Sequence, residues 1–393
     1  MIEKVKALAN KYKEDVVAIR RHLHQYPELS FKEFETSKFI QNTLTEWGIE
    51  FKAGYVNTGI VAYVKGSKPE SKVIALRADM DALPIQEEND FDFASVHPGV
   101  MHACGHDVHT SSLLGAIRIL DAVKDQFEGT VKCIFQPAEE ILPGGASLMI
   151  EEGVLEDPKP EVIVGQHVYP DLPAGKVGMK EGMYMASADE LYMKVRGKGG
   201  HAALPHTVID PVLITAHILV ALQQIVSRNA KPDIPSVLSF GKIIADGATN
   251  IIPDEVNLSG TFRTFDESWR DEAHEKMIRM AESIAESMGG ACDFEVRKGY
   301  PFLVNDKQVT AHSKNAAIEY VGEDNVVDLG LRMTAEDFAY YSQHIPGCFY
   351  RLGTAKPGTK ASGLHTSTFN VDEDSLEIGM GLMSWITLKQ LGG

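Results

Sequence analysis

A short stretch between His102 and Thr110 concentrates residues that could bind a metal ion. It reads His102-Ala103-Cys104-Gly105-His106-Asp107-Val108-His109-Thr110. Cysteine sulfur and histidine nitrogen are ligands that transition-metal ions prefer in proteins. The glycine between Cys104 and His106 would let the backbone turn tightly around an ion. The alternative, a histidine-rich turn without a metal, is less favoured because further candidate ligands follow along the chain.

Acidic residues follow two predicted strands at their carboxyl ends. The strand at 72–77 leads into Asp79 and Asp81, and the strand at 129–136 leads into Pro137-Ala138-Glu139-Glu140. In open α/β sheets, ligands bind outside the carboxyl ends of the strands. A capped turn after the first strand and a solvated glutamate pair after the second are the alternatives.

Two histidines complete the candidate set. His167 ends the strand predicted at 161–167, and His365 follows a strand predicted at 348–353. A single histidine at a strand end could be an ordinary core residue. Because His167 is the third polar strand end in succession, a ligand role is favoured.

The predicted metal ligands are Cys104, His106, Glu140, His167 and His365. Five ligands are too many for one tetrahedral ion with an open position, and they suit two ions instead. Two cations roughly 3.5–4 Å apart would lower the pKa of a bridging water and polarise a carbonyl group. Glu139 would then be the general base and later the acid toward the leaving amine. The donor set is compatible with manganese, zinc, cobalt or nickel.

The elements that must position these residues form an α/β pattern. Helices are predicted near 3–24, 33–47, 111–120, 210–228, 269–287, 307–320, 335–344 and 373–390. Strands are predicted near 59–64, 72–77, 129–136, 161–167, 190–196, 236–244, 255–263, 292–296 and 348–353. Strands that alternate with helices predict a mostly parallel sheet with helices on both faces.

The order of elements changes near residue 187. From there the chain follows the strand–helix–strand–strand–helix–strand order of a ferredoxin-like unit. We therefore predict a discontinuous catalytic domain, residues 1–186 and 298–393. A ferredoxin-like α+β lid domain, residues 187–297, is inserted into it.

The predicted lid carries its own polar residues. His201 follows the glycines of Gly197-Lys198-Gly199-Gly200 and could stabilise the oxyanion of a tetrahedral intermediate. Asn250 could donate a hydrogen bond to substrate, and Arg263 could pair with a substrate carboxylate in bidentate fashion. Each could instead be a loop residue or part of a structural ion pair.

Composition narrows the class of protein. The chain has 393 residues, 44% of them hydrophobic, which is enough for two domains with sizeable cores. Its formal net charge of −17 argues against nucleic acid or an anionic membrane surface as a partner. No run of eighteen apolar residues occurs, so no membrane-spanning helix is expected. The cysteines lack a disulfide-framework spacing, and the first residues do not resemble a signal peptide, so a cytoplasmic location is expected.

Motifs along nearly the whole chain resemble those of the metal-dependent aminoacylase and carboxypeptidase family, in its amidohydrolase branch. That branch includes hippurate hydrolases, N-acyl-amino-acid amidohydrolases, N-acetyldiaminopimelate deacetylases and plant auxin-conjugate hydrolases. The matching stretches are Arg21–Ser30, Arg77–Pro84, His102–Thr110, Gln136–Glu140, Gly165–His167, Gly199–Ala203, Thr249–Pro253, Thr334–Phe338 and His365.

The resemblance implies a catalytic domain with two divalent metal ions and a lid that forms a homodimer. It implies the same five ligands, with Glu139 as the acid and base. His201 would act on the carbonyl oxygen, either from the same subunit or from the partner subunit. The expected reaction is hydrolysis of an N-acetyl or aromatic N-acyl amino acid to a carboxylate and a free amino acid. A carboxypeptidase or dipeptidase acting on short peptides is the alternative, and a metal-binding protein without catalysis is disfavoured by the presence of Glu139.

Overall fold

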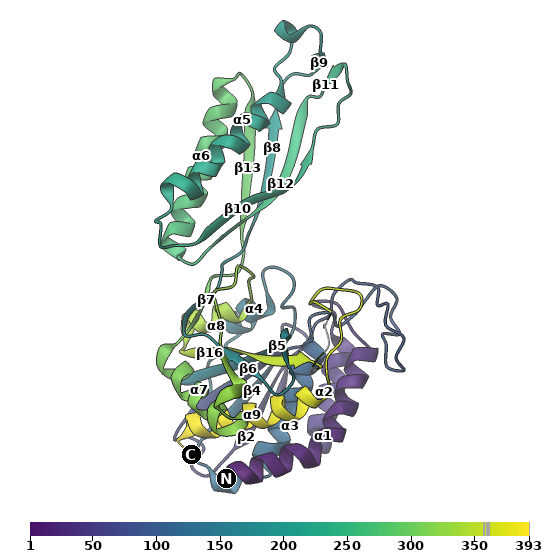
Figure 1. Ribbon diagram of the computed structural model, residues 1–393, viewed down its shortest axis with the longest axis vertical. Coiled ribbons are helices and arrows are strands. Elements are labelled where there is room, and N and C mark those ends of the chain that lie inside the picture. The colour runs from purple at the N-terminus through teal and green to yellow at the C-terminus, as the bar shows by residue number, and fades with distance from the viewer. Residues whose placement is uncertain (357, 359–361, 393) are drawn as a thin grey trace. The chain divides into compact units, whose positions relative to one another are not determined.

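The computed structural model describes residues 1–356, 358 and 362–392 and divides the chain into two units (Figure 1). The first unit contains Met1–Tyr184, Val304–Gly330 and Asp337–Gly393. The second contains Met185–Leu303 together with the short segment Leu331–Glu336, which the sequence analysis did not place there. Whether the units act as catalytic domain and lid stays a prediction.

An eight-stranded sheet forms the centre of the first unit, in the order β1-β2-β4-β3-β5-β16-β6-β15. The strands are β1 (Glu50–Tyr55), β2 (Gly59–Lys65), β3 (Val73–Asp79), β4 (Thr130–Gln136), β5 (Val162–Pro173), β6 (Val177–Met179), β15 (Val326–Asp328) and β16 (Gly347–Ala355). The four central strands, from β4 to β16, run parallel to one another, whereas β2 and β6 on either side of them are antiparallel. The predicted mostly parallel α/β fold is confirmed.

Helices cover both faces of this sheet. They are α1 (Ile2–Gln25), α2 (Phe34–Glu46), α3 (His106–Asp121), α4 (Gly145–Glu151), α7 (Lys307–Val321), α8 (Phe338–His344) and α9 (Asp374–Leu391). On β3, Ile74 and Leu76 face the larger hydrophobic core, which α1, α3 and α9 also form. Arg77 points to the opposite face, where it reaches Asp337 at the start of α8. Successive side chains of β3 therefore point to opposite faces of the sheet, one toward the hydrophobic core and the other toward α8.

The carboxyl ends of the parallel strands bring the candidate residues to one edge of the sheet. Asp79 at the end of β3 lies opposite Gln136 at the end of β4, and His167 of β5 lies beside Arg351 of β16. Helix α3 begins at His106, five residues earlier than predicted, because Gly105 takes a left-handed conformation with φ 83°. A Cβ atom there would lie 2.5 Å from the Val168 side chain, so glycine is required.

The second unit is a four-stranded antiparallel sheet in the order β10-β12-β8-β13. Its elements are β8 (Asp189–Arg196), α5 (Pro211–Gln224), β10 (Ser236–Ile244), β12 (Glu255–Thr264), α6 (Glu267–Ser287) and β13 (Ala291–Lys298). Helices α5 and α6 lie on one face and share a hydrophobic core with the strands (Figure 1). The predicted ferredoxin-like arrangement is confirmed.

Two short ribbons were not anticipated, and the helix predicted at 210–228 is more apolar than expected. Strand β9 (Gly200–His201) pairs with β11 (Ile251–Ile252), and β7 (Gly182–Met185) pairs with β14 (Leu303–Asn305). The stretch Pro211–Asn229 is, by length and composition, long and apolar enough to cross a membrane, contrary to the expectation that no segment would qualify. Its inner face, with Ile214 and Ile218, is buried in the core of the second unit.

Candidate metal centre

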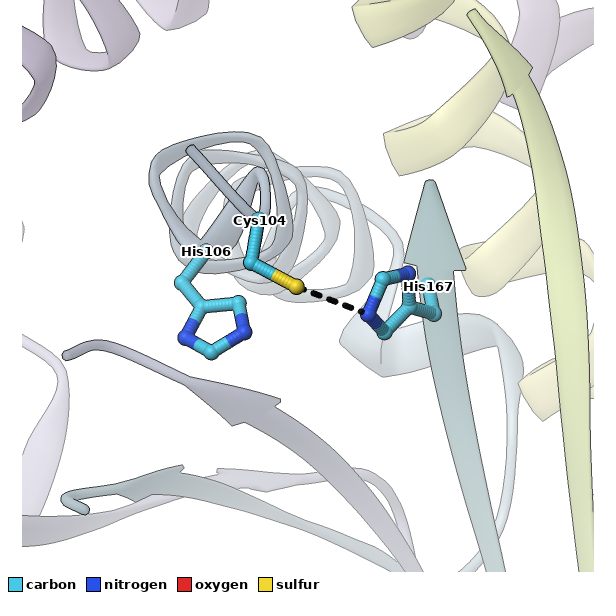
Figure 2. A group of neighbouring side chains, drawn as sticks. All are labelled: Cys104, His106 and His167. Carbon is cyan, nitrogen blue, oxygen red and sulfur yellow. Dashed lines mark hydrogen bonds between the residues drawn. The ribbon is translucent and has the colours of Figure 1, made fainter. Parts of the chain in front are cut away.

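The five predicted ligands converge in the first unit from four separate parts of the chain. Cys104 and His106 stand at the start of α3, Glu140 follows β4, His167 lies on β5 and His365 follows β16. The Cys104 Sγ atom is 3.5 Å from His167 Nε2 and 3.3 Å from His365 Nε2. Figure 2 shows the Cys104 thiol directed at the His167 ring, with the His106 ring beside them.

These side chains form two groups that share the cysteine. One group contains Cys104, His106 and His167, and the other contains Cys104, Glu140 and His365, with the ligand atoms of each group within 4.8 Å of one another. The Glu140 carboxylate also lies 3.3 Å from His365 Nε2 and 3.9 Å from His106 Nε2. A thiolate common to both groups could bridge two ions.

Within the described residues, two buried atoms of the cluster make no hydrogen bond, namely His106 Nε2 and Glu140 Oε1, although Glu140 Oε1 lies within ion-pair distance of His365 Nε2. Buried polar atoms are normally hydrogen-bonded, so a nitrogen and a carboxylate oxygen that make no hydrogen bond in the same small space call for an explanation. A cation between them would bind both lone pairs. The residues present therefore fit a metal ion at this point.

The imidazole rings of two candidate ligands are oriented by partners on their far side. His106 Nδ1 lies 3.1 Å from Asp81 Oδ1, and His167 Nδ1 lies 2.8 Å from the Val168 carbonyl oxygen. Because Nδ1 donates in each ring, Nε2 is left with its lone pair facing the cluster. Asp81 is itself fixed by Ser30 Oγ at 2.6 Å.

The electrostatics of the cluster also fit a bound cation. Burial raises the pKa of the Cys104 thiol well above its ordinary value, and the Glu140 carboxylate raises it further. Burial alone would lower the pKa of His106, but the carboxylates of Asp79 and Asp81 outweigh it and raise the pKa to about 10. A divalent cation would supply the charge that protons otherwise supply, and thiolate ligation would then be favoured.

Glu139 reaches the same space from a strained turn. Its side chain is buried, and its Oε2 atom lies 4.0 Å from His106 Nε2. The preceding residue, Ala138, has φ 52°, a left-handed conformation that is uncommon for alanine. Strained backbone of this kind is found at functional sites. Glu139 is therefore placed where it could take a proton from a water at the cluster.

The structure describes the other predicted residues in the second unit. His201 on β9 is exposed, and the Ala202 amide donates to the Asn250 carbonyl at 3.0 Å, so His201 and Asn250 lie near one another. Arg263 on β12 is half-buried and donates to the Met333 carbonyl at 2.9 Å. Their catalytic and substrate-binding roles stay predictions.

His109 lies among the candidate ligands but has both ring nitrogens occupied. Its Nδ1 atom is 2.6 Å from Asp79 Oδ1, and its Nε2 atom accepts from the Val168 amide at 2.8 Å. Since the amide can only donate, Nε2 carries no proton and Nδ1 donates to Asp79. His109 thus fixes the backbone beside His167 instead of binding metal. The spacing of His106 and His109 in the sequence does not tell which of the two histidines is a candidate ligand.

We expect His109→Leu to lower the affinity of the metal-free protein for Mn²⁺ by roughly 10–100-fold, the usual effect of losing an outer-shell partner. Leucine leaves both the Val168 amide and the Asp79 carboxylate without their partner. His109→Gln can still donate and accept, so it should bind nearly as well as the unaltered chain. Calorimetric titration measures both, and equal affinity for His109→Leu would show that Val168 needs no such support.

Comparison with known proteins adds to this geometry. The model of the family described as "Peptidase family M20/M25/M40" matches residues 75–388. An N-acetyl-L-cysteine deacetylase of Bacillus subtilis is 41% identical over 363 residues, covering 92% of this chain and 85% of that protein. An N-acyl-L-amino acid amidohydrolase of Geobacillus stearothermophilus is 44% identical over 303 residues, covering 77% and 81%. The crystal structure of a dinuclear metal-binding M20 peptidase from Bacillus subtilis superposes with a TM-score of 0.84 at 36% identity, covering 98% and 99%.

Proposed function

Since the chain belongs to peptidase family M20/M25/M40 and is a metal-dependent hydrolase, we propose that it cleaves the amide bond of N-acyl amino acids. The products are a carboxylate and a free amino acid. One observation carries the proposal. Five metal-type ligands, Cys104 among them, surround a space that the buried Glu139 carboxylate also reaches.

The metal ions would be held in two sets that share Cys104, the first with His106 and His167 and the second with Glu140 and His365. When bound, they supply Lewis acidity toward the amide carbonyl and toward the attacking water.

The residues of the chain supply the remaining steps. Glu139 takes a proton from the attacking water and later delivers one to the leaving nitrogen. We assign His201 to hold the developing oxyanion, because it is exposed on a ribbon whose neighbour is Asn250. Arg263 would pair with the substrate carboxylate. One terminal nitrogen of its guanidinium group donates to a backbone carbonyl, and a guanidinium group can donate two parallel hydrogen bonds to a carboxylate.

A carboxypeptidase or dipeptidase acting on short peptides is the second candidate, because the matching family and the superposed crystal structure are described as peptidases. The two candidates differ in the amine of the substrate. An N-acyl amino acid has no free α-amine, because its α-nitrogen is part of the amide, whereas a dipeptide has a free α-amine.

The deciding experiment measures amino acid released from N-acetyl, N-benzoyl and unblocked dipeptide substrates with added Mn²⁺, Zn²⁺ or Co²⁺. Release from the blocked substrates alone supports the amidohydrolase. Release from free dipeptides alone would replace it by the peptidase.

We also propose a homodimer formed through the second unit. Its edge strand β10 and helix α5 expose apolar side chains, and Val220 is 77% exposed while Leu213 is 52% exposed. Apolar surface of this kind marks interaction sites. Sedimentation analysis should show a dimer that Val220→Asp weakens; a wild-type monomer at micromolar concentration would contradict the proposal.

A reducing compartment would suit this enzyme, and we propose the cytoplasm. Cys104 can serve as a ligand only while it is unoxidised, and all four cysteines of the chain are free and buried. Fractionation of cells would test the location.

A further inference from the structure

A buried carboxylate, Glu33, lies just before α2, and the proposed reaction has no use for it. The Glu33 residue is 0% exposed, and burial together with the nearby Asp81 carboxylate raises its pKa to about 7. Burying a carboxylate is unfavourable unless it is well hydrogen-bonded. Its partners therefore indicate what the burial achieves.

Glu33 accepts hydrogen bonds from two strained parts of the backbone. Its Oε1 atom accepts from the Phe31 amide and from the Ala138 amide, each at 2.9 Å. Phe31 has φ 65° and Ala138 has φ 52°, so both are non-glycine residues in the left-handed region. The second oxygen, Oε2, is 3.0 Å from the Thr58 hydroxyl. One carboxylate thus holds two unfavourable backbone conformations in place.

The anchored residue Ala138 directly precedes Glu139 and Glu140. Its carbonyl oxygen accepts from the Gly145 amide at 2.8 Å, so both polar groups of its backbone are fixed. A Cβ atom on Gly145 would lie 1.8 Å from the Pro137 carbonyl oxygen, which leaves the turn no room to shift in that direction. The directions of the Glu139 and Glu140 side chains follow from this turn.

We propose that Glu33 is a positioning residue, which holds the turn Pro137–Glu140 so that Glu139 faces the attacking water and Glu140 faces the metal. The roles of these two glutamates rest on the proposed function. In this proposal Glu33 contacts neither the substrate nor the metal. It acts through the amide of Ala138.

The test compares Glu33→Leu and Glu33→Gln in the full-length protein. Glutamine keeps an acceptor for both amides, so its kcat should stay within about threefold of wild type. Leucine removes the acceptor, and its kcat should fall at least about 100-fold, with KM little changed, because proton transfer by Glu139 contributes about that much. Bound metal should fall from two ions per chain toward one, since only the group containing Glu140 depends on the turn.

A second substitution separates positioning from a general structural role. Glycine adopts a left-handed conformation without strain, so Ala138→Gly added to Glu33→Leu should restore part of the lost kcat and metal content. If Glu33→Leu does not fold, Glu33→Asp is used instead. Its shorter side chain does not reach the Ala138 amide. Glu28→Gln is the matched control, because the Glu28 carboxylate accepts the Thr36 amide at 2.8 Å within the same segment.

Three results would overturn the proposal: wild-type kcat and two ions in Glu33→Leu, no rescue by Ala138→Gly, or equal loss in Glu33→Gln or Glu28→Gln. Metal content is measured without substrate. It therefore decides the role of Glu33 even if the wild-type protein hydrolyses no N-acyl amino acid.

Discussion

Glu139→Gln should lower kcat by about 10³-fold while two metal ions stay bound, because general acid–base catalysis typically contributes 10²–10⁴-fold. Glutamine has the shape of glutamate but cannot take a proton from water. Glu139 is buried and lies 4.0 Å from His106 Nε2, in a group with His106 and Glu140, whereas Glu140 also belongs to the group with Cys104 and His365. The loss should therefore appear in kcat, with little effect on KM or metal content.

Glu140→Gln is the matched control, since it makes the same chemical change, one carboxylate oxygen to an amide nitrogen, at the neighbouring residue. It should lose metal and activity together, because Glu140 directs a buried carboxylate oxygen at the cluster beside Cys104 and His365. Metal content by elemental analysis and kcat on the best N-acyl substrate are the two measurements. Near wild-type turnover in Glu139→Gln, or equal metal loss in both variants, would show that the two glutamates are assigned wrongly.

The pattern of strands and helices predicted the fold because it is set by local periodicity. Strands that alternate with helices favour a parallel sheet, and a parallel sheet brings strand ends to one edge. That reasoning brought Glu140, His167 and the His102–Thr110 stretch to the same place, where the structure also has them. Strand β1 was missed because it lies at the edge of the sheet and has little buried surface to give an apolar alternation.

The arrangement around the ligands could not be predicted in the same way, because it depends on contacts between distant segments. The Glu33 carboxylate and the Ala138 amide are 105 residues apart. His109 and His106 both stand on the first turns of α3, and residue type does not tell which one is a ligand. Only the Val168 amide and the Asp79 carboxylate, which occupy both nitrogens of His109, make the distinction.

Cys104 should be the residue whose replacement affects both ions at once. It is the only residue shared by the groups with His167 and with His365 among the clusters that the described residues form. Cys104→Ala removes the shared ligand, and we expect the affinity for Mn²⁺ or Zn²⁺ to fall by more than about 100-fold, which exceeds the usual loss of an outer-shell partner. Titration of the metal-free protein measures the affinity, and activity should fall with it.

Cys104→Asp distinguishes a bridging ligand from a merely structural cysteine. A carboxylate can also bridge two cations, so this variant should keep two ions and part of the activity. Oxygen is harder than sulfur, and the preference should therefore move from Zn²⁺ toward Mn²⁺. The cobalt-loaded wild type should show sulfur-to-metal charge-transfer absorption that Cys104→Asp lacks. Unchanged affinity and an unchanged cobalt spectrum in Cys104→Ala would mean that the thiol is not a ligand, and the two ions would then have to be held by His106, Glu140, His167 and His365 without a sulfur bridge.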